Sequence, residues 1–393
     1  MTQHIGIFVT GGIAAYKVPL LVRALVRAGN EVRVVMTDAA KAFVTEATLA
    51  TVSKAAVLTD RNEFAQPEHV AHVALAHWMD LAVVVPATAN TIAKLAVGMA
   101  DNVVTTTLLA FSGPKLLVPA MNDQMWLNAQ TQANVAHLQQ AGWQVLPPAT
   151  GFLAEGYAAV GRMPDLPVIE TFIATVQPVA FLTGQRVLVT AGGTRERIDP
   201  VRYIGNDSSG QMGTALANVA AAAGAEVTLI TTATLPTLPQ VTVVPVADAA
   251  AMRTAVQATF PAVDIAIMAA AVADYRPVEQ ADHKLKKHGA DGLTLALAQN
   301  PDILAELGAT KTHQVVVGFA AETNDLLANA TAKLTKKRAD LLVANRVGAG
   351  LGFNQPTNAV TLLAPDQAPV ALPEAPKVTI AAQILRHIQQ VRA

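Results

Sequence analysis

Short apolar runs alternate along the whole chain with longer stretches in which apolar residues recur at helical spacing. The apolar runs, which we take as strands, are 5–9, 31–36, 81–85, 115–118, 187–189, 226–231, 241–245, 265–269 and 315–319. Such runs are typical of strands buried on both faces, as in parallel sheets covered by helices on each side. The pattern predicts an α/β protein that begins a doubly wound, nucleotide-type fold twice.

Polar loops follow four of the strands predicted in the first half. They comprise residues 10–14, 37–43, 86–90 and 119–126. Ligands of open parallel sheets bind at the carboxyl ends of the strands, so these loops are expected to converge on one site. The segment 147–164 is rich in Gly, Pro and Ala and is interpreted as a mobile flap over that edge.

The stretch 190–213 begins the fold again, with a predicted strand, a glycine turn, a polar loop and a helix N-terminus. Glycines let a backbone approach a ligand, and free helix N–H groups favour anions. Gly192-Gly193 does not fit the dinucleotide fingerprint. Gly205 and Gly210 have the Walker spacing, but Gln211 replaces the essential Lys. The pattern excludes a P-loop NTPase and leaves a plain loop as an open alternative.

Size and composition restrict the class of protein. The 393 residues suit two domains, which we place at 1–177 and 185–393 with a linker at 178–184. A net charge of −1 favours neither nucleic acid nor an anionic membrane as a partner. The absence of Cys excludes disulfides and thiolate metal sites. No apolar run approaches the ~18 residues of a membrane span, and a cytoplasmic enzyme is expected.

Histidines and lysines supply the candidate chemistry. His69 and His72 share one face of a helix predicted at 69–78, with no carboxylate one helical turn away. Three interpretations stay open: surface or capping residues, a general base, and a metal pair. Lys333 and Lys337 are one helical turn apart, and 284–287 contains three lysines. These lysines suit either a solvated face or a triphosphate.

Taken in order, these motifs resemble the bifunctional phosphopantothenoylcysteine decarboxylase/phosphopantothenate–cysteine ligase family of bacterial coenzyme A synthesis. The first-half motifs are 11–17, His72 before Trp78, 86–90, 98–102, 119–122 with 125–126, and 161–163. The second-half motifs are 190–213, 270–274, 284–287, 300–304 and 318–323. The resemblance covers nearly the whole chain, and the ordered set is far more specific than any single motif.

The resemblance implies a fold and two linked reactions. A C-terminal Rossmann-like half would activate 4′-phosphopantothenate with CTP as an acyl-cytidylate, which cysteine then attacks. An N-terminal flavodoxin-like half would bind FMN and convert the product to 4′-phosphopantetheine. Oxidation of the cysteinyl thiol to a thioaldehyde would provide the electron sink for loss of CO₂. Mg²⁺ would assist nucleotidyl transfer, with ligands that the sequence does not assign.

The resemblance also assigns site residues in the decarboxylase half. The residues expected around FMN are Gly11, Gly12, Thr37, Phe43, Ala87, Thr88, Asn90 and Met121. His72 would be the active-site base. Asn122 would bind the substrate carboxylate, and Met125 would also contact the substrate.

In the ligase half, the residues expected around CTP are Asp274, Lys284, Pro301, Asp302, Ile303, Leu304, Phe319, Lys333 and Lys337. Lys284 would stabilise the charge that develops in nucleotidyl transfer. Arg202 and Asn206 would serve the cysteine step. As a family feature, the decarboxylase half would form trimers with the flavin site at subunit interfaces, and the ligase half dimers.

One position departs from the family pattern. Where the family has a Cys-Gly pair in the flap, this chain has Glu155-Gly156. The family Cys protonates the enethiolate intermediate, so another group must do this here. A carboxyl that loses solvent stays protonated more readily, which makes Glu155 a candidate acid. The alternative is that Glu155 is a solvated flap residue and that another group donates the proton.

Two other functions stay open at this point. One is a two-domain flavin/nicotinamide oxidoreductase, although the dinucleotide fingerprint is missing. The other is a flavin-binding regulatory subunit, although the CTP half looks complete. In every case the expected partners are small molecules and further copies of the chain, without nucleic acid or membrane.

Overall fold

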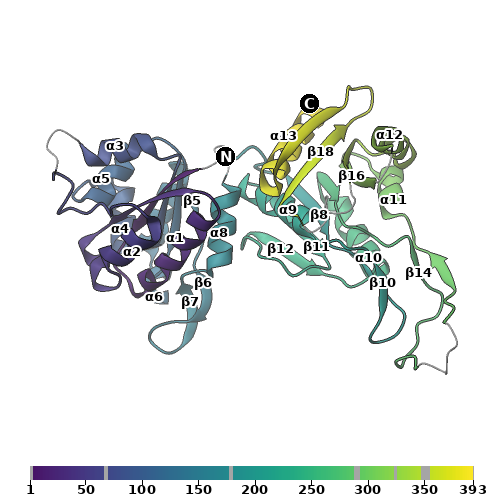
Figure 1. Ribbon diagram of the computed structural model, residues 1–393, viewed down its shortest axis with the longest axis horizontal. Helices are drawn as coiled ribbons and strands as arrows, with labels where there is room; N and C mark the ends of the chain where they lie inside the picture. The colour runs from purple at the N-terminus through teal and green to yellow at the C-terminus, as the bar shows by residue number, and fades with distance from the viewer. Residues whose placement is uncertain are drawn as a thin grey trace. The chain divides into compact units, whose positions relative to one another are not determined.

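The computed structural model describes residues 3–65, 70–176, 180–286, 293–322, 325–346 and 355–392. The chain forms two compact units, Met1–Pro178 and Val179–Ala393 (Figure 1). The break lies inside the segment expected to be a linker. Leu182, also expected in the linker, is buried and donates its N–H to the Ala223 carbonyl, at an N···O distance of 2.9 Å, within the second unit.

A five-stranded parallel sheet with the order β2-β1-β3-β4-β5 forms the centre of the first unit. Its strands are β1 (His4–Val9), β2 (Glu31–Met36), β3 (Leu81–Ala87), β4 (Lys115–Pro119) and β5 (Gln144–Val145). This is the flavodoxin-like strand order, so the expected fold is confirmed. The short β5 was not predicted, because two residues carry no periodicity.

Strand β3 extends beyond the predicted end at 85. It continues through Pro86 to Ala87, with a register shift against β4 between Val84 and Ala87. Proline has no N–H for the ladder, and an irregularity in the register accommodates it. The prediction that Pro86 ends the strand was therefore wrong by two residues.

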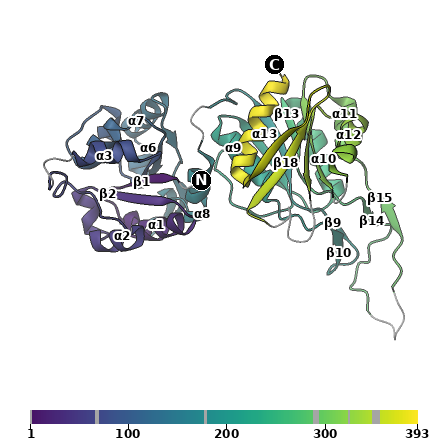
Figure 2. The same ribbon diagram turned by 45° about the horizontal axis from the view of Figure 1, so that its top comes forward.

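Helices cover both faces of this sheet: Figure 2 shows α1 and α2 on one side of β1 and β2, and α3 and α7 on the other. The α-helices are α1 (Val18–Arg27), α2 (Glu46–Ser53), α3 (Ala71–Trp78), α4 (Ala89–Ala96), α5 (Val103–Ala110), α6 (Asp123–Leu127), α7 (Ala129–Gln140) and α8 (Leu166–Thr175). Two 3-10 helices, η1 (Ile13–Lys17) and η2 (Asp38–Ala42), follow β1 and β2. Side-chain caps start several helices; Thr88, Asn102 and Asn128 accept N–H groups of α4, α5 and α7.

The segment 147–164, expected to be a flap, contains an antiparallel hairpin. Its strands are β6 (Ala149–Phe152) and β7 (Ala158–Arg162). In Figure 1 this hairpin projects from the first unit. Its strands escaped prediction because Gly and Ala dominate them and no apolar alternation marks them.

The second unit contains an eight-stranded sheet with the order β12-β11-β8-β13-β16-β17-β18-β19. Its strands are β8 (Arg186–Ala191), β11 (Glu226–Thr231), β12 (Val241–Pro245), β13 (Ile265–Met268), β16 (Val315–Glu322), β17 (Leu341–Arg346), β18 (Thr357–Leu363) and β19 (Val370–Pro376). The first six strands in that order are parallel and follow the Rossmann arrangement 3-2-1-4-5-6. Strands β18 and β19 form an antiparallel hairpin at one edge of the sheet.

The helices of this unit are α9 (Gln211–Ala222), α10 (Ala249–Thr259), η3 (Phe260–Ala262), α11 (Ile303–Thr310), α12 (Leu326–Lys337) and α13 (Lys377–Arg392). Two small antiparallel pairs stand outside the main sheet: β9 (Arg195–Arg197) with β10 (Tyr203–Gly205), and β14 (Tyr275–Pro277) with β15 (Leu297–Gln299). Within the described ranges, no helix has the length and apolar character needed to cross a membrane.

Candidate functional site

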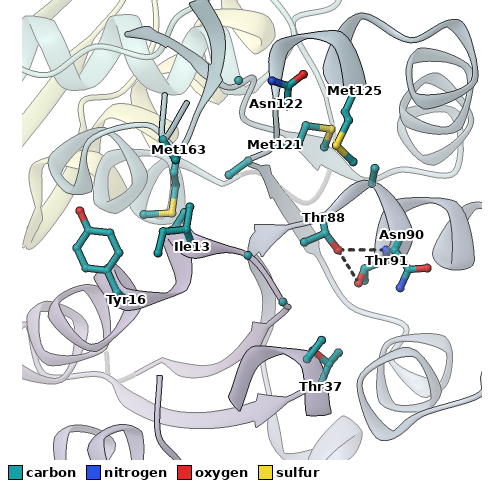
Figure 3. Close-up of a pocket in the computed structure, with 18 of the residues that line it drawn as sticks. Ile13, Tyr16, Thr37, Thr88, Asn90, Thr91, Met121, Asn122, Met125 and Met163 are labelled. Atoms are coloured by element: carbon teal, nitrogen blue, oxygen red, sulfur yellow. Dashed lines mark hydrogen bonds between the residues drawn. The ribbon is translucent and has the colours of Figure 1, made fainter. Parts of the chain in front are cut away.

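A cavity of about 910 Å³ lies at the carboxyl edge of the first sheet (Figure 3). The four strand-end loops and the β6–β7 hairpin all contribute to its walls. The lining includes these residues expected from the sequence: Gly11, Gly12, Thr37, Thr88, Asn90, Met121, Asn122, Met125 and Glu155. The convergence of the loops on one site is therefore confirmed.

One end of this cavity suits an anion. The Thr10 hydroxyl donates to the Pro86 carbonyl at an O···O distance of 2.7 Å and accepts the Thr88 N–H at an N···O distance of 3.1 Å. Thr88 in turn caps α4, whose N-terminal N–H groups face this edge. A Cβ at Gly11 would lie 2.5 Å from the Ala39 Cβ, so only glycine allows this close passage of the loop.

The other end of the cavity is apolar. Met121 and Met125 lie together in Figure 3, and Met163 lies beside Ile13, which with Tyr16 comes from η1. Thioether side chains are polarisable and adapt to flat aromatic surfaces. This end therefore suits a planar ring system, and the opposite end suits the ring's anionic substituent.

The tip of the hairpin contacts Asn122. The Asn122 amide donates to Glu155 Oε1 at an N···O distance of 2.9 Å and to Tyr157 Oη at 3.0 Å. Tyr157 donates to Asp123 Oδ1 at an O···O distance of 2.6 Å. This last bond lowers the pKa of Asp123 and raises that of Tyr157, because it favours the anionic acceptor and the protonated donor. Glu155 itself is exposed here.

His72 lies on α3 and forms a pair that the sequence did not suggest. Its Nδ1 is 2.6 Å from Glu63 Oε1, and the two side chains are only 17% and 9% exposed. Glu63 precedes His72 by nine residues, outside the spacing of one helical turn at which side chains of one helix meet. The contact favours an oriented imidazole over a free surface histidine. His69 lies outside the described residues.

Three residues expected in the decarboxylase site do not line the cavity. Ala87 is buried at the end of β3, Phe43 follows η2 with its side chain partly exposed, and His72 faces Glu63. In the described part of the chain, no cluster of three or more His, Asp or Glu residues could hold a metal ion.

A second cavity, of about 690 Å³, lies at the carboxyl edge of the second sheet. The loops after β13 and β15, the loop before α9, and α12 contribute to it. The expected residues that line it are Asn206, Asp274, Pro301, Asp302, Ile303, Leu304, Phe319, Lys333 and Lys337.

Local hydrogen bonds hold the walls of this second cavity. The Asn206 amide donates to the Ala271 and Val272 carbonyls at N···O distances of 3.2 and 3.3 Å, which joins the glycine loop to the end of β13. Asp302 caps α11 through the Ala305 N–H at 3.0 Å and pairs with Lys337. Lys333, Lys337 and the N-terminus of α11 therefore meet at the second cavity.

Arg202 and Lys284 do not line the second cavity. Arg202 donates two guanidinium N–H groups to Asp199 Oδ2, at N···O distances of 3.0 and 2.6 Å, and one to the Leu285 carbonyl at 2.8 Å. Lys284 is exposed in the adjacent segment 281–286. Lys287, the last residue of the lysine motif, lies outside the described residues.

Comparison with known proteins matches both units. The Flavoprotein family model matches residues 1–177, and the model for the DNA/pantothenate metabolism flavoprotein C-terminal domain matches residues 182–391. The coenzyme A biosynthesis bifunctional protein CoaBC of Vibrio vulnificus is 45% identical over 386 residues, covering 97% of this chain and 96% of the relative. The Bacillus subtilis protein of the same name is 42% identical over 393 residues, covering 98% and 96%.

Among solved structures, the C-terminal domain of a coenzyme A biosynthesis bifunctional protein CoaBC is 40% identical. It covers 54% of this chain and 97% of its own, with a TM-score of 0.47. The alternative of a two-domain flavin/nicotinamide oxidoreductase has no support among these matches. From its two matched domains and its near full-length relatives, the chain belongs to the family of bifunctional coenzyme A biosynthesis proteins, CoaBC.

Proposed function

We propose that this chain catalyses two consecutive steps of coenzyme A biosynthesis. The second unit joins 4′-phosphopantothenate and cysteine at the expense of CTP, and the first unit decarboxylates the product to 4′-phosphopantetheine. The observation that carries the proposal is that each unit has its own cavity at the carboxyl edge of its sheet, lined by the motif residues of one reaction. Membership of the family over nearly the whole chain supports it.

The first cavity fits FMN. Thr88 and the α4 N-terminus offer donors for the phosphate, and Met121, Met125 and Met163 form an apolar wall for the ring. Bound FMN supplies the two-electron chemistry that makes the cysteinyl carboxylate a group able to leave as CO₂. The Asn122 amide binds that carboxylate, since it already donates to the carboxylate of Glu155. Glu155 then has to leave Asn122 when substrate arrives.

His72 is the proposed base of the decarboxylase. The Glu63 carboxylate fixes the ring through Nδ1, which leaves Nε2 as the nitrogen able to take a proton. Because His72 does not line the cavity of its own chain, we propose that the flavin site is completed between subunits. The expected trimers and dimers, and the cytoplasmic location, stay predictions.

The second cavity fits CTP as substrate. Lys333 and Lys337 supply positive charge beside the α11 N-terminus, where triphosphate oxygens are favourable. Asp274 and Asn300 provide polar groups for the nucleoside, beside the apolar side chains of Leu304 and Phe319. Attack of the 4′-phosphopantothenate carboxylate on the α-phosphorus releases pyrophosphate, and the cysteine amine then displaces CMP.

Mg²⁺ is proposed to arrive with the triphosphate. Two carboxylates that line the second cavity, Asp274 and Asp302, are assigned to the CTP site. Asp302 already accepts the Ala305 N–H and pairs with Lys337. Such a donor set offers no closed protein cage. It suits Mg²⁺, which keeps several waters and binds mainly through substrate phosphates.

The test uses the full-length chain with 4′-phosphopantothenate, cysteine, CTP and Mg²⁺. We expect CTP-dependent release of pyrophosphate and CMP, and 4′-phosphopantetheine and CO₂ once FMN is bound. Omitting cysteine should stop CMP release while the acyl-cytidylate accumulates. Thermal stabilisation by NADPH but not by CTP, together with no pyrophosphate release, would contradict the proposal.

A further inference from the structure

Asp199 is a fully buried carboxylate in the turn between β9 and β10, and it accepts five N–H groups. Its side chain is 0% exposed. Oδ1 accepts the backbone N–H groups of Val201 and Arg202, each at an N···O distance of 2.8 Å. Oδ2 accepts two guanidinium N–H groups of Arg202 and, at 3.2 Å, the backbone N–H of Leu285. A buried charge is stable only when it is paired and hydrogen-bonded in this way.

The last of these bonds joins two segments far apart in the sequence. Leu285 is 86 residues from Asp199. The Leu285 carbonyl also accepts an Arg202 N–H at an N···O distance of 2.8 Å, so both its backbone groups are bound to the turn. The Ala281 N–H donates to the Ile198 carbonyl at 3.0 Å. The segment 281–286 is thus attached to the turn at two points, and Lys284 lies between them.

The remaining contacts of Asp199 are within its own turn, and it does not line the second cavity. Hydrogen bonds from Arg202 are the main reason that the pKa of Asp199 lies far below its usual range. The carboxylate therefore stays charged at neutral pH and keeps its acceptors available to Leu285. Nearby, β9 and β14 pack together (Figure 2). The hydrogen bond from Ala281 to Ile198 holds the start of the segment 281–286 beside the turn.

We propose that Asp199 is a positioning residue of the ligase, which anchors Leu285 and Arg202 and thereby sets the location of Lys284. The inference rests on the proposed function, and on the expectation from the family resemblance that Lys284 stabilises the charge that develops in nucleotidyl transfer. Asp199 itself lies outside the lining of the second cavity. Its effect is to restrict where the Lys284 ammonium can go, and small displacements of a charge-stabilising group lower a rate strongly.

The test uses full-length Asp199→Asn. Asn keeps the shape and the Oδ1 acceptor, but it removes the charge and presents an amide where Arg202 and Leu285 donate. We expect faster hydrogen–deuterium exchange in peptides covering 281–286, and acyl-cytidylate formation slower by about 10-fold to 100-fold in single turnover without cysteine. The KM for CTP should stay near that of the parent, because the lining of the second cavity is unchanged.

Asp264→Asn is the matched control. Asp264 is a mostly buried carboxylate that accepts the Arg186 N–H at an N···O distance of 2.8 Å, just before β13, at the opposite edge of the sheet. It should lower stability and leave acyl-cytidylate formation and exchange at 281–286 unchanged. If Asp199→Asn does not fold, Leu285→Pro replaces it, since Pro removes the Leu285 N–H and leaves the buried carboxylate with Arg202.

The outcomes separate the two proposals. Faster exchange with slower acyl-cytidylate formation and an unchanged KM supports the role of Asp199. Parent-like acyl-cytidylate formation in the variant overturns that role, as does unchanged exchange. A parent chain that forms no acyl-cytidylate from CTP overturns the proposed function itself, and with it this inference.

Discussion

At the scale of single residues, the hydrogen bonds of the Asn122 side-chain amide are the main polar contacts between the first cavity and the hairpin tip. The amide donates hydrogen bonds to Glu155 and Tyr157 at the hairpin tip. The Glu155 carboxylate therefore already takes the hydrogen-bond donor that we assign to the substrate carboxylate. When the substrate takes that amide, Glu155 is released close to the reacting atoms. A carboxyl enclosed there by the hairpin and the flavin loses solvent, and desolvation favours its protonated form.

Glu155→Gln tests whether Glu155 is the acid. Gln keeps an acceptor for Asn122 but cannot give a proton to carbon. We expect one CO₂ per flavin, flavin left reduced, and the oxidised enethiol as product. Glu155→Cys should restore turnover. The measurement is anaerobic single turnover, followed by flavin absorbance and product mass; a full yield of phosphopantetheine from Glu155→Gln would exclude this role.

Lys284 and Asn206 should affect different half-reactions of the ligase. Lys284→Gln should abolish acyl-cytidylate formation, because the charge that develops there loses its cation. Asn206→Asp should let the acyl-cytidylate accumulate without transfer to cysteine. Its new carboxylate would also face the Ala271 and Val272 carbonyls, to which Asn206 now donates.

Quench analysis of pyrophosphate, acyl-cytidylate and the ligated product separates the two steps. Loss of activity at the same half-reaction in both variants would show that this division of roles is wrong. Parent-like CTP binding in each variant is the control for an intact second cavity.

At the scale of elements, the hairpin β6–β7 is held to the rest of the first unit by a close backbone approach. Gly161 in β7 accepts the Met121 N–H at an N···O distance of 3.0 Å. Its φ is +134°, a conformation that side-chain-bearing residues rarely adopt, and a Cβ there would strike the Met121 carbonyl oxygen. Glycine therefore lets the hairpin reach the loop that carries Met121 and Asn122.

Gly161→Ala should consequently lower both stability and FMN affinity. The left-handed backbone alone costs about 1–2 kcal/mol, and the clash with Met121 adds to it. Gly156→Ala is the matched control: its φ is +89°, but no atom lies within 4 Å of the new Cβ. Thermal unfolding and FMN titration measure both effects, and equal losses in the two variants would contradict a role for the close approach.

At the scale of the whole molecule, each unit has its own core, its own sheet and its own cavity. The break at Pro178 and Val179 follows α8, which packs on α1 within the first unit. The described residues that line the first cavity all belong to the first unit. The first unit should therefore bind its cofactor independently of the second.

A fragment of residues 1–180 is expected to fold and to bind FMN, with the contacts confined to residues 1–165. The measurement is the flavin absorbance that stays with the protein after gel filtration. A fragment of residues 180–393 treated in the same way should stay colourless. A folded 1–180 fragment that also stays colourless would show that the second unit is needed for the site.

Much of the fold followed from local patterns. The apolar runs of buried parallel strands predicted β2, β11 and β12 at their observed bounds. The polar loops at 10–14, 37–43, 86–90 and 119–126 and the stretch 190–213 indicated the two ligand edges. Strand β17 was missed: it begins four residues after α12 ends, and a short apolar run cannot be told from a helix continuation. The motifs indicated the family, because their order along the chain does not depend on where each helix or strand begins and ends.

The sequence by itself determined the fold class, the two ligand edges and the residue types that line them, since each depends on neighbours along the chain. Only the tertiary structure decided which distant groups meet. It brought Glu63 to His72, Asp302 to Lys337 and Asp199 to Leu285. It also placed Ala87 in the hydrophobic core and not in the wall of the first cavity. Such contacts depend on how loops from different strands fold over one edge, and no periodicity along the chain records that arrangement.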